Sequence, residues 1–344
     1  MSTKAAVPSL SGYEYRRVIR IALGSCLGFT ISKLMGWPYG VFFAVYPILL
    51  LGMAPVFNLK IALEFCLSVL INVVEIWLLK TFFTPFPLLM TLAVFAVFCL
   101  HFRNMAKGNN IMMWTSGVVT LAVMLHFGSY PTTSLTDMTV STLLATVISV
   151  AGGAVLFWLL PDNEAPAMPA RPPLSVAQIN HRMLMGATLA TLSFVVFQVF
   201  NLRDSLSAQV ATILVLFPMT YSASLMNAWN RVRGVAMGCT LALISQLLMY
   251  NLISHLVLVV MAMFMTLLLA ARIHMLERIG SGVGFGALTT IGILYGQYLQ
   301  PNADFLYSSF YRLASVVVAL IILMMTAYFL DSALNKISWA KDVA

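Results

Sequence analysis

Three ionisable side chains lie inside apolar runs of this 344-residue chain. Glu64 and Glu75 stand in the run 59–80, and Arg312 stands in the run 305–330. The two carboxylates are eleven residues apart, close to three helical turns, so they share one helix face about 16 Å apart along the axis. A carboxylate in a low-dielectric cavity can take up a proton, and an arginine can bind a carboxylate through two hydrogen bonds. Buried ionisable residues in apolar segments mark functional sites by default, so these three are the candidates for transport and proton coupling.

Each candidate also has a structural interpretation. Lys60 precedes Glu64 by one turn, and an ion pair within the helix would account for that carboxylate. Glu75 and Arg312 are expected at similar depth, toward the non-cytoplasmic ends of their helices. A Glu75–Arg312 pair would be either a static bridge between two halves of the protein, or a proton-sensitive gate or anion site that opens in transport.

A second pair of cations begins another apolar run, in the sequence NAWNRVRGVAMG. Arg231 and Arg233 are either anchors at the cytoplasmic boundary or residues that recruit an organic anion from the cytoplasm. Gly234 and Gly238 follow them at the GxxxG spacing, which allows helices to pack closely.

Two prolines follow an aromatic residue inside apolar runs, at Tyr46-Pro47 and at Phe217-Pro218, 171 residues apart. Proline removes a backbone hydrogen bond and clashes with the preceding turn, so we expect both to kink their helices. In lipid a freed carbonyl needs a polar partner, and broken helices of transporters often line a cavity. The two kinks therefore either line a cavity between the halves or are structural bends.

The composition sets the environment of these residues. The chain is 61% hydrophobic and only 9% charged, whereas ordinary soluble domains carry about 25% charged residues. An all-α polytopic membrane protein with about twelve spans is predicted, because apolar runs of bilayer length recur throughout. The predicted spans are 17–34, 39–53, 59–80, 87–102, 111–126, 135–160, 183–200, 206–221, 232–250, 256–273, 280–298 and 305–330.

The basic residues predict the orientation. Roughly fifteen of the 19 Lys and Arg residues fall on the side of the N-terminus, so both termini are expected in the cytoplasm. The net charge of +8 is spread over many short loops, and it therefore indicates topology rather than nucleic-acid binding.

The segment 161–180 is rich in proline and polar residues and has the character of a linker. Six predicted spans lie on each side of it, and matching residues recur 169 positions apart, as with Arg103 and Arg272 or Asp162 and Asp331. This pattern predicts two parallel six-helix repeats related by an axis along the membrane normal. The first half would be 1–160, the linker 161–180, the second half 181–331, and the cytoplasmic tail 332–344.

The R-x-R-G-x-x-x-G start of the ninth run, with Arg312 followed by Ala314 and Ser315, resembles the fusaric acid resistance and aromatic acid exporter family. The chain lacks the large cytoplasmic region that many such exporters carry between their halves, so it resembles a compact branch. In the first half, Lys60 and Glu64 stand where the second half has Arg233 and Met237.

The resemblance implies a secondary transporter of the bacterial inner membrane. It would export aromatic or other organic acids, driven by the proton gradient, beside a periplasmic adaptor protein of the membrane-fusion type. The expected partners are the lipid bilayer, a small organic anion and that adaptor, with a homo-oligomer left open and no nucleic acid.

Two other classes of protein are alternatives to a transporter: a membrane scaffold and an enzyme. A non-transporting scaffold or assembly factor would tolerate neutral replacement of Glu75 and Arg312, whereas a coupled transporter would not. The five histidines are dispersed, and the sequence contains no P-loop, HEXXH motif or Cys/His metal spacing. We therefore expect no enzymatic activity, no cofactor and no metal site.

Overall fold

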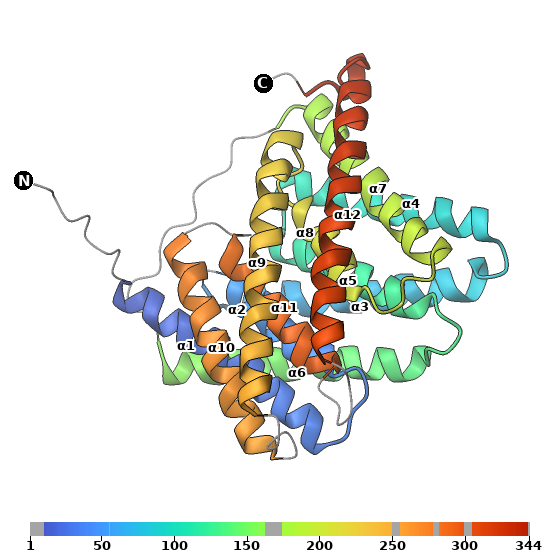
Figure 1. Cartoon of the computed structure of the whole chain (residues 1–344). Coiled ribbons are helices and arrows are strands. Elements are labelled where there is room, and N and C mark those ends of the chain that lie inside the picture. The colour runs from blue at the N-terminus through green and yellow to red at the C-terminus, as the bar shows by residue number, and fades with distance from the viewer. Residues whose placement is uncertain are drawn as a thin grey trace, which may run out of the picture.

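The computed structural model of the chain describes residues 10–54, 56–161, 174–249, 255–277, 282–298 and 305–342. In these ranges the chain forms twelve α-helices, a π-helical turn and a 3₁₀ turn, and no strand (Figure 1). They are α1 (Gly12–Leu34), α2 (Gly40–Met53), α3 (Leu59–Phe83), α4 (Pro87–Lys107), α5 (Ile111–Gly128), α6 (Leu135–Leu159), α7 (Val176–Val199), α8 (Leu206–Val215), α9 (Tyr221–Leu248), α10 (Leu256–Glu277), α11 (Val283–Ile293), the π turn η1 (Leu294–Tyr298), α12 (Phe305–Leu334) and the 3₁₀ turn η2 (Ser338–Ala340).

Seven of the described helices are long and apolar enough to cross a membrane. They are α3, α4, α5, α6, α7, α10 and the part Ser309–Leu334 of α12. The chain is therefore a multi-pass helical membrane protein, as its composition predicts. The helices α2 and α8 have only 14 and 10 residues, so the described helices include fewer full-length spans than the twelve predicted.

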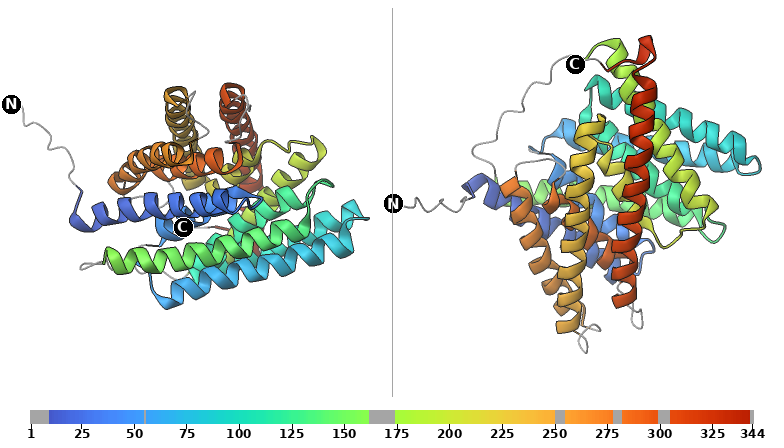
Figure 2. Two further views of the ribbon diagram at one scale, coloured as in Figure 1. Left: turned by 90° about the horizontal axis from the view of Figure 1, so that it is seen from below. Right: turned by 45° about the horizontal axis from the view of Figure 1, so that its top comes forward.

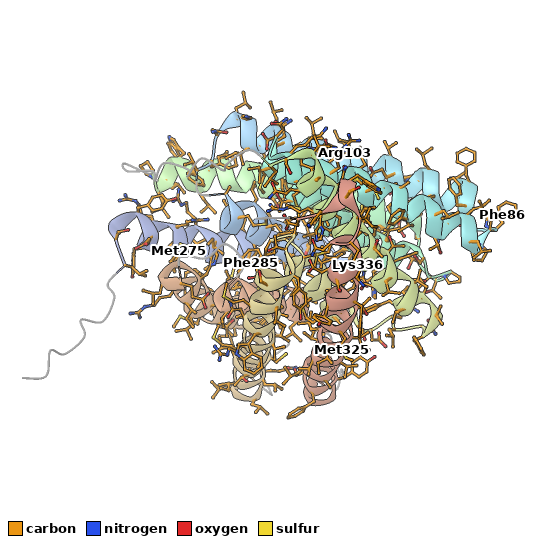
Figure 3. All side chains as sticks on the ribbon, turned by 90° about the horizontal axis from the view of Figure 1, so that it is seen from above. Phe86, Arg103, Met275, Phe285, Met325 and Lys336 are labelled. Carbon is orange, nitrogen blue, oxygen red and sulfur yellow. The ribbon has the colours of Figure 1, made fainter. Side chains whose placement is uncertain are left out.

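Four helices form the interior. All ten residues of α8 are buried, as are residues 41–52 of α2 and 284–293 of α11, and 78% of α5 is buried. The long helices surround this interior and expose apolar side chains such as Leu63 and Leu70 of α3. Figure 3 shows Phe285 of α11 among the helices and Phe86 at the outer tip of the α3–α4 pair. Burial of the short helices and an apolar outer surface are what a lipid environment requires.

The long helices do not share one direction. Figures 1 and 2 show α9 and α12 side by side, running across the direction of α3, α4 and α6. No single membrane normal can lie along both groups, so at least one group must cross the bilayer at a tilt. Packing against neighbouring helices sets how far each group tilts.

Pro47 lies inside α2, where it was predicted, and α1 compensates for its effect. Proline has no N–H, so the carbonyl of Phe43, four residues earlier, loses its helical partner. That carbonyl packs directly against the Cα of Gly28 on α1. The next carbonyl, of Ala44, accepts a hydrogen bond of 2.7 Å from the hydroxyl of Ser25. The proline therefore costs α2 little, because α1 brings a glycine and a serine to the open carbonyls.

Pro218 does not kink a helix, and here the prediction of a symmetric pair is wrong. Helix α8 ends at Val215, and Phe217 and Pro218 lie in the turn that joins α8 to α9. A residue before proline is driven out of the helical region, and Met219 after it adopts a positive φ of 59°. Helix α8 therefore ends before the proline, although the apolar run that continues to residue 221 predicted a single bent helix.

Other boundaries also differ from the prediction. Helix α9 begins at Tyr221, so Arg231 and Arg233 lie well inside it rather than at its start. The end of the predicted linker, from Val176 onward, forms the first turns of α7. Asp162, with the rest of 162–173, lies outside the described residues.

We predict that Gly28→Ala disrupts the packing of α1 on α2. A methyl group at Gly28 would collide with the Phe43 carbonyl, which is backbone and cannot rotate away. Overpacking of this kind lowers the free energy of unfolding by about 1–3 kcal/mol. Thermal unfolding of the purified protein in detergent measures it.

Gly12→Ala is the matched control on the same helix, because nothing lies within 4 Å of a Cβ at that position. Its unfolding midpoint should stay level or rise, since alanine favours helix over glycine by up to about 1 kcal/mol. Equal midpoints for the two variants would contradict the packing at Gly28.

Candidate functional site

Glu64 faces the interior from the first turns of α3. Its carboxylate lies 3.9 Å from the ammonium group of Lys60 on the preceding turn. The Glu64 side chain is 10% exposed, whereas the Lys60 side chain is 75% exposed. The ion pair within the helix, one of the two interpretations of Glu64, is therefore present.

Glu75 pairs with His101 of α4 and not with Arg312. Both carboxylate oxygens lie close to Nε2 of His101, at 3.0 and 3.1 Å. The His101 side chain is 1% exposed and that of Glu75 is 12% exposed. The pair joins α3 to α4 within the first half of the chain, so the predicted bridge between the halves is absent.

The inward face of α3 carries a stripe of polar groups. The hydroxyl of Ser68 lies 3.0 Å from that of Ser116 on α5, and the Asn72 amide donates to the carbonyl of Gly117 at 2.9 Å. Glu64, Ser68, Asn72 and Glu75 are spaced three or four residues apart, which places them on one face of the helix. The common face predicted for Glu64 and Glu75 is confirmed.

Arg312 is buried between α12 and α8. Its Nη1 donates to the hydroxyl of Ser207 at 2.8 Å, and the side chain is 1% exposed. Arg312 therefore links α12 to α8 within the second half of the chain.

Arg231 is a buried cation that the surrounding structure satisfies only in part. It is 2% exposed, and Nη2 donates to the hydroxyl of Thr289 on α11 at 2.8 Å. Nε and Nη1 are buried and have no hydrogen-bond partner in the part of the chain that the structure describes. The charge is thus buried, and two of the three guanidinium nitrogens have no acceptor among the described residues.

Glycines account for the burial of Arg231. A Cβ at Gly234 would lie 2.5 Å from the carbonyl of Val283 and 2.8 Å from the Cα of Gly286. Gly238, one turn later, meets Thr290 of α11 in the same way. The close helix packing that the GxxxG spacing predicted is therefore present. It lets the backbones of α9 and α11 come into contact, and this contact covers Arg231.

Arg233 has a different environment although it is two residues away. It is exposed, and its guanidinium lies 5.0 Å from the ring centre of Trp229, which is also exposed. The structure does not bring the two arginines together. Only Arg231 points into the protein.

A small cavity lies where the four inner helices meet. Its lining comes from Val41, Phe42, Val45, Tyr46 and Leu49 of α2, Val119, Thr120 and Val123 of α5, Leu206 and Val210 of α8, and Ile293 of α11. Its volume of about 10 Å³ is room for about one water molecule. Tyr46 lines it, whereas Pro47, Phe217 and Pro218 do not.

The sequence did not indicate two of the residues that complete these sites. His101 was one of five dispersed histidines, and Thr289 was one of many threonines in apolar runs. Their partners lie 26 and 58 residues away in the chain, on other helices, so no local spacing could reveal them. The only related signal in the sequence was the row of polar residues on α3, because it indicated that Glu75 faces a polar partner on another helix.

The fold and these buried charges define a multi-pass helical membrane protein with ionisable groups in its interior. A family model described as "Protein of unknown function (DUF2955)" matches residues 17–156, which cover α1 to α6 almost completely. The match includes Glu64, Glu75 and His101 but neither Arg231 nor Arg312, and it gives no link to the exporter family. No curated protein and no solved structure matches the chain.

We predict that Arg231→Met stabilises the protein. Burying a charge without full hydrogen bonding is costly, and apolar replacement of such groups is often neutral or stabilising by about 1–4 kcal/mol. The thermal unfolding midpoint in detergent should therefore rise. The exposed Arg233→Met is the control, with a change within about 0.5 kcal/mol. A clear loss of stability in Arg231→Met alone would contradict this prediction, because it would mean that the guanidinium stabilises the folded protein.

Proposed function

We propose that the protein is a secondary transporter that exports organic acids, with aromatic carboxylates as the chemical class that the resemblance favours, and that Arg231 binds the carboxylate. The observation that carries this proposal is the buried guanidinium of Arg231, with Nε and Nη1 open. A protein keeps such a group inside a membrane domain at a cost in stability, and function is the usual reason. A guanidinium forms strong, charge-assisted hydrogen bonds to a carboxylate, and Nε and Nη1 are the nitrogens available for them here.

The packing of the helices supports two six-helix repeats, α1–α6 and α7–α12. In the first half α2 packs on α1 and α6, and α3 packs on α5; in the second half α8 packs on α7 and α12, and α9 packs on α11. Contacts between the halves recur in the same way, because α4 packs on α7 as α10 packs on α1, and α5 packs on α8 as α11 packs on α2. A pseudo-two-fold relation between the halves would produce this pattern.

The cavity supports alternating access between these halves. It is lined by α2 and α5 of the first half and by α8 and α11 of the second. At about 10 Å³ it is too small for an aromatic acid, so this conformation is a closed one. Rocking of one half against the other would open the interior to one side of the membrane at a time.

The remaining charged candidates have distinct roles in this proposal. Exposed Arg233 recruits the anion from the cytoplasm, and Arg312 competes for the carboxylate nearer the other side. Glu75 belongs to the site that binds the transported proton, whereas Glu64, paired with Lys60, contributes to the charge of the α3 face. The proposal places both termini in the cytoplasm, the protein in a bacterial inner membrane, and a periplasmic adaptor of the membrane-fusion type beside it.

The test is transport by purified protein in liposomes under an imposed pH gradient, with a panel of labelled aromatic carboxylates. We predict gradient-dependent movement of at least one carboxylate by the wild type, and a fall of at least tenfold in its initial rate for Arg231→Gln. Arg272→Gln, whose side chain is exposed on α10 and has no role in the proposal, should keep at least half of the rate. Insertion and unfolding midpoints of the variants serve as controls for folding.

Two outcomes would contradict the proposal. If Arg231→Gln transports as fast as the wild type, the carboxylate does not bind there. If the wild type moves none of the carboxylates, with or without a co-reconstituted adaptor, a non-transporting scaffold becomes the better description.

A further inference from the structure

We propose that Glu75 and His101 together form the site that binds the transported proton, with Nδ1 of His101 as the atom that receives it. This inference rests on the proposed transport function and specifies how the proton is coupled. It replaces the role expected of a Glu75–Arg312 pair. It also gives a function to a histidine whose spacing in the sequence indicated none.

The geometry of the pair determines where its first proton lies. Nε2 of His101 lies within 3.1 Å of both oxygens of Glu75, so a hydrogen must stand between the nitrogen and the carboxylate. With an ionised Glu75 that hydrogen is on Nε2, because a carboxylate can only accept. The imidazole is then neutral, its second nitrogen is unprotonated, and the pair carries one net negative charge.

Nδ1 is free to take the second proton. It is buried and has no hydrogen-bond partner in the described part of the chain, and the same holds for Oδ1 of Asn72. A proton from the aqueous side that binds Nδ1 converts the ring to imidazolium beside the carboxylate. One N–H bond forms as the proton leaves a hydronium ion, no other bond of the pair changes, and the net charge of the pair rises from minus one to zero.

Neutralisation is what favours proton uptake in this position. An isolated negative charge in an apolar interior is costly, whereas an adjacent imidazolium and carboxylate compensate each other. The pair therefore keeps its proton while enclosed and releases it when the site gains contact with water. A site with this property couples proton movement to opening and closing of the protein.

No other charged group is shown to neutralise the pair. The helices packed on α3 and α4 are α5, α6 and α7. Their titratable residues, with those of α3 and α4 themselves, are Lys60, Glu64, Cys66 and Lys80 of α3; Cys99, Arg103 and Lys107 of α4; His126 of α5; Asp137 of α6; and His181 and Arg182 of α7. Lys60 and Glu64 pair with each other, Lys80 donates to the carbonyl of Gly128, His126 contacts the Arg203 carbonyl, and His181 contacts Asp331.

Helix α5 connects the pair to the cavity. The ring of His101 packs against Gly117, where an added Cβ would lie 3.1 Å from Cε1 and Nδ1. Asn72 donates to the carbonyl of the same glycine. Two residues further along, α5 begins to line the cavity with Val119 and Thr120. A change in the charge of His101 therefore acts on α5, the helix that forms one wall of this cavity.

The experiment compares His101→Gln and Glu75→Gln with the wild type in the same liposomes. A glutamine at 101 can still donate a hydrogen bond to Glu75 but cannot take up a proton. His126→Gln is the matched control, because His126 is a buried histidine of α5 whose Nε2 lies 2.9 Å from the backbone carbonyl of Arg203 rather than beside a carboxylate. Two transport modes are measured: accumulation of a labelled carboxylate driven by a pH gradient, and exchange of labelled for unlabelled carboxylate at equal pH.

We predict that both dyad variants lose at least tenfold in gradient-driven accumulation, while their exchange rates stay within about twofold of the wild type. His126→Gln should keep both modes. Gradient-driven accumulation by either dyad variant at the wild-type rate would overturn the proposal, and so would equal loss of both modes, since that would indicate a structural role.

A second measurement keeps the test independent of transport. Infrared difference spectra of the purified protein between pH 8 and pH 5 report protonation of imidazole and carboxylate groups directly. The wild type should show an imidazole signal that is absent from His101→Gln and present in His126→Gln. If that signal is unchanged in His101→Gln, the proton site is wrong even where transport is established; if it is lost while no carboxylate moves, the proton site stands and the transport function fails.

Discussion

Close contact between helix backbones, made at glycine, determines how this protein holds its interior together. Gly28 lies on the Phe43 carbonyl between α1 and α2, Gly234 lies on Gly286 between α9 and α11, and Gly296 of the π turn lies on Gly40 and Val41. In a bilayer the hydrophobic effect does not drive helices together, so association depends on packing and on hydrogen bonds between helices. Such contacts help to enclose the short inner helices α2 and α11.

The same contacts explain how charges come to be buried. The approach of α9 to α11 covers Arg231 and leaves Thr289 as its hydrogen-bond partner. The approach of α5 to α3 and α4 at Gly117 encloses His101 beside Glu75. In both places a glycine on an inner helix brings an ionisable side chain of an outer helix into the interior. Close helix contacts at glycine thus position both the cation and the carboxylate that the proposed transport cycle uses.

Part of this arrangement could be predicted from the sequence. The apolar composition indicated a helical membrane protein, the spacing of Glu64 and Glu75 placed both on one inward face, and the GxxxG spacing indicated a close helix contact. These features are local, because helical periodicity relates residues within a few turns. Pro47 inside α2 was also a local inference.

The rest depends on contacts between distant segments. The polar sequence YSASLMNAWN suggested a loop, but it forms the first turns of α9, where Ser224 and Asn227 are buried against other helices. An apolar pattern that continued past Pro218 concealed the end of α8 at Val215. The partners of Glu75 and Arg231 lie on other helices, and packing rather than spacing brings them together.

The decisive measurement is carboxylate binding by the purified protein, read as the shift of its thermal unfolding midpoint with increasing benzoate. A ligand that binds only the folded state stabilises it by RT ln(1 + [L]/Kd), so the midpoint of the wild type should rise steadily once the concentration exceeds Kd. Arg231→Gln should show no such rise, while the exposed Arg272→Gln should follow the wild type. The same rise in Arg231→Gln as in the wild type would contradict a carboxylate site at the buried guanidinium.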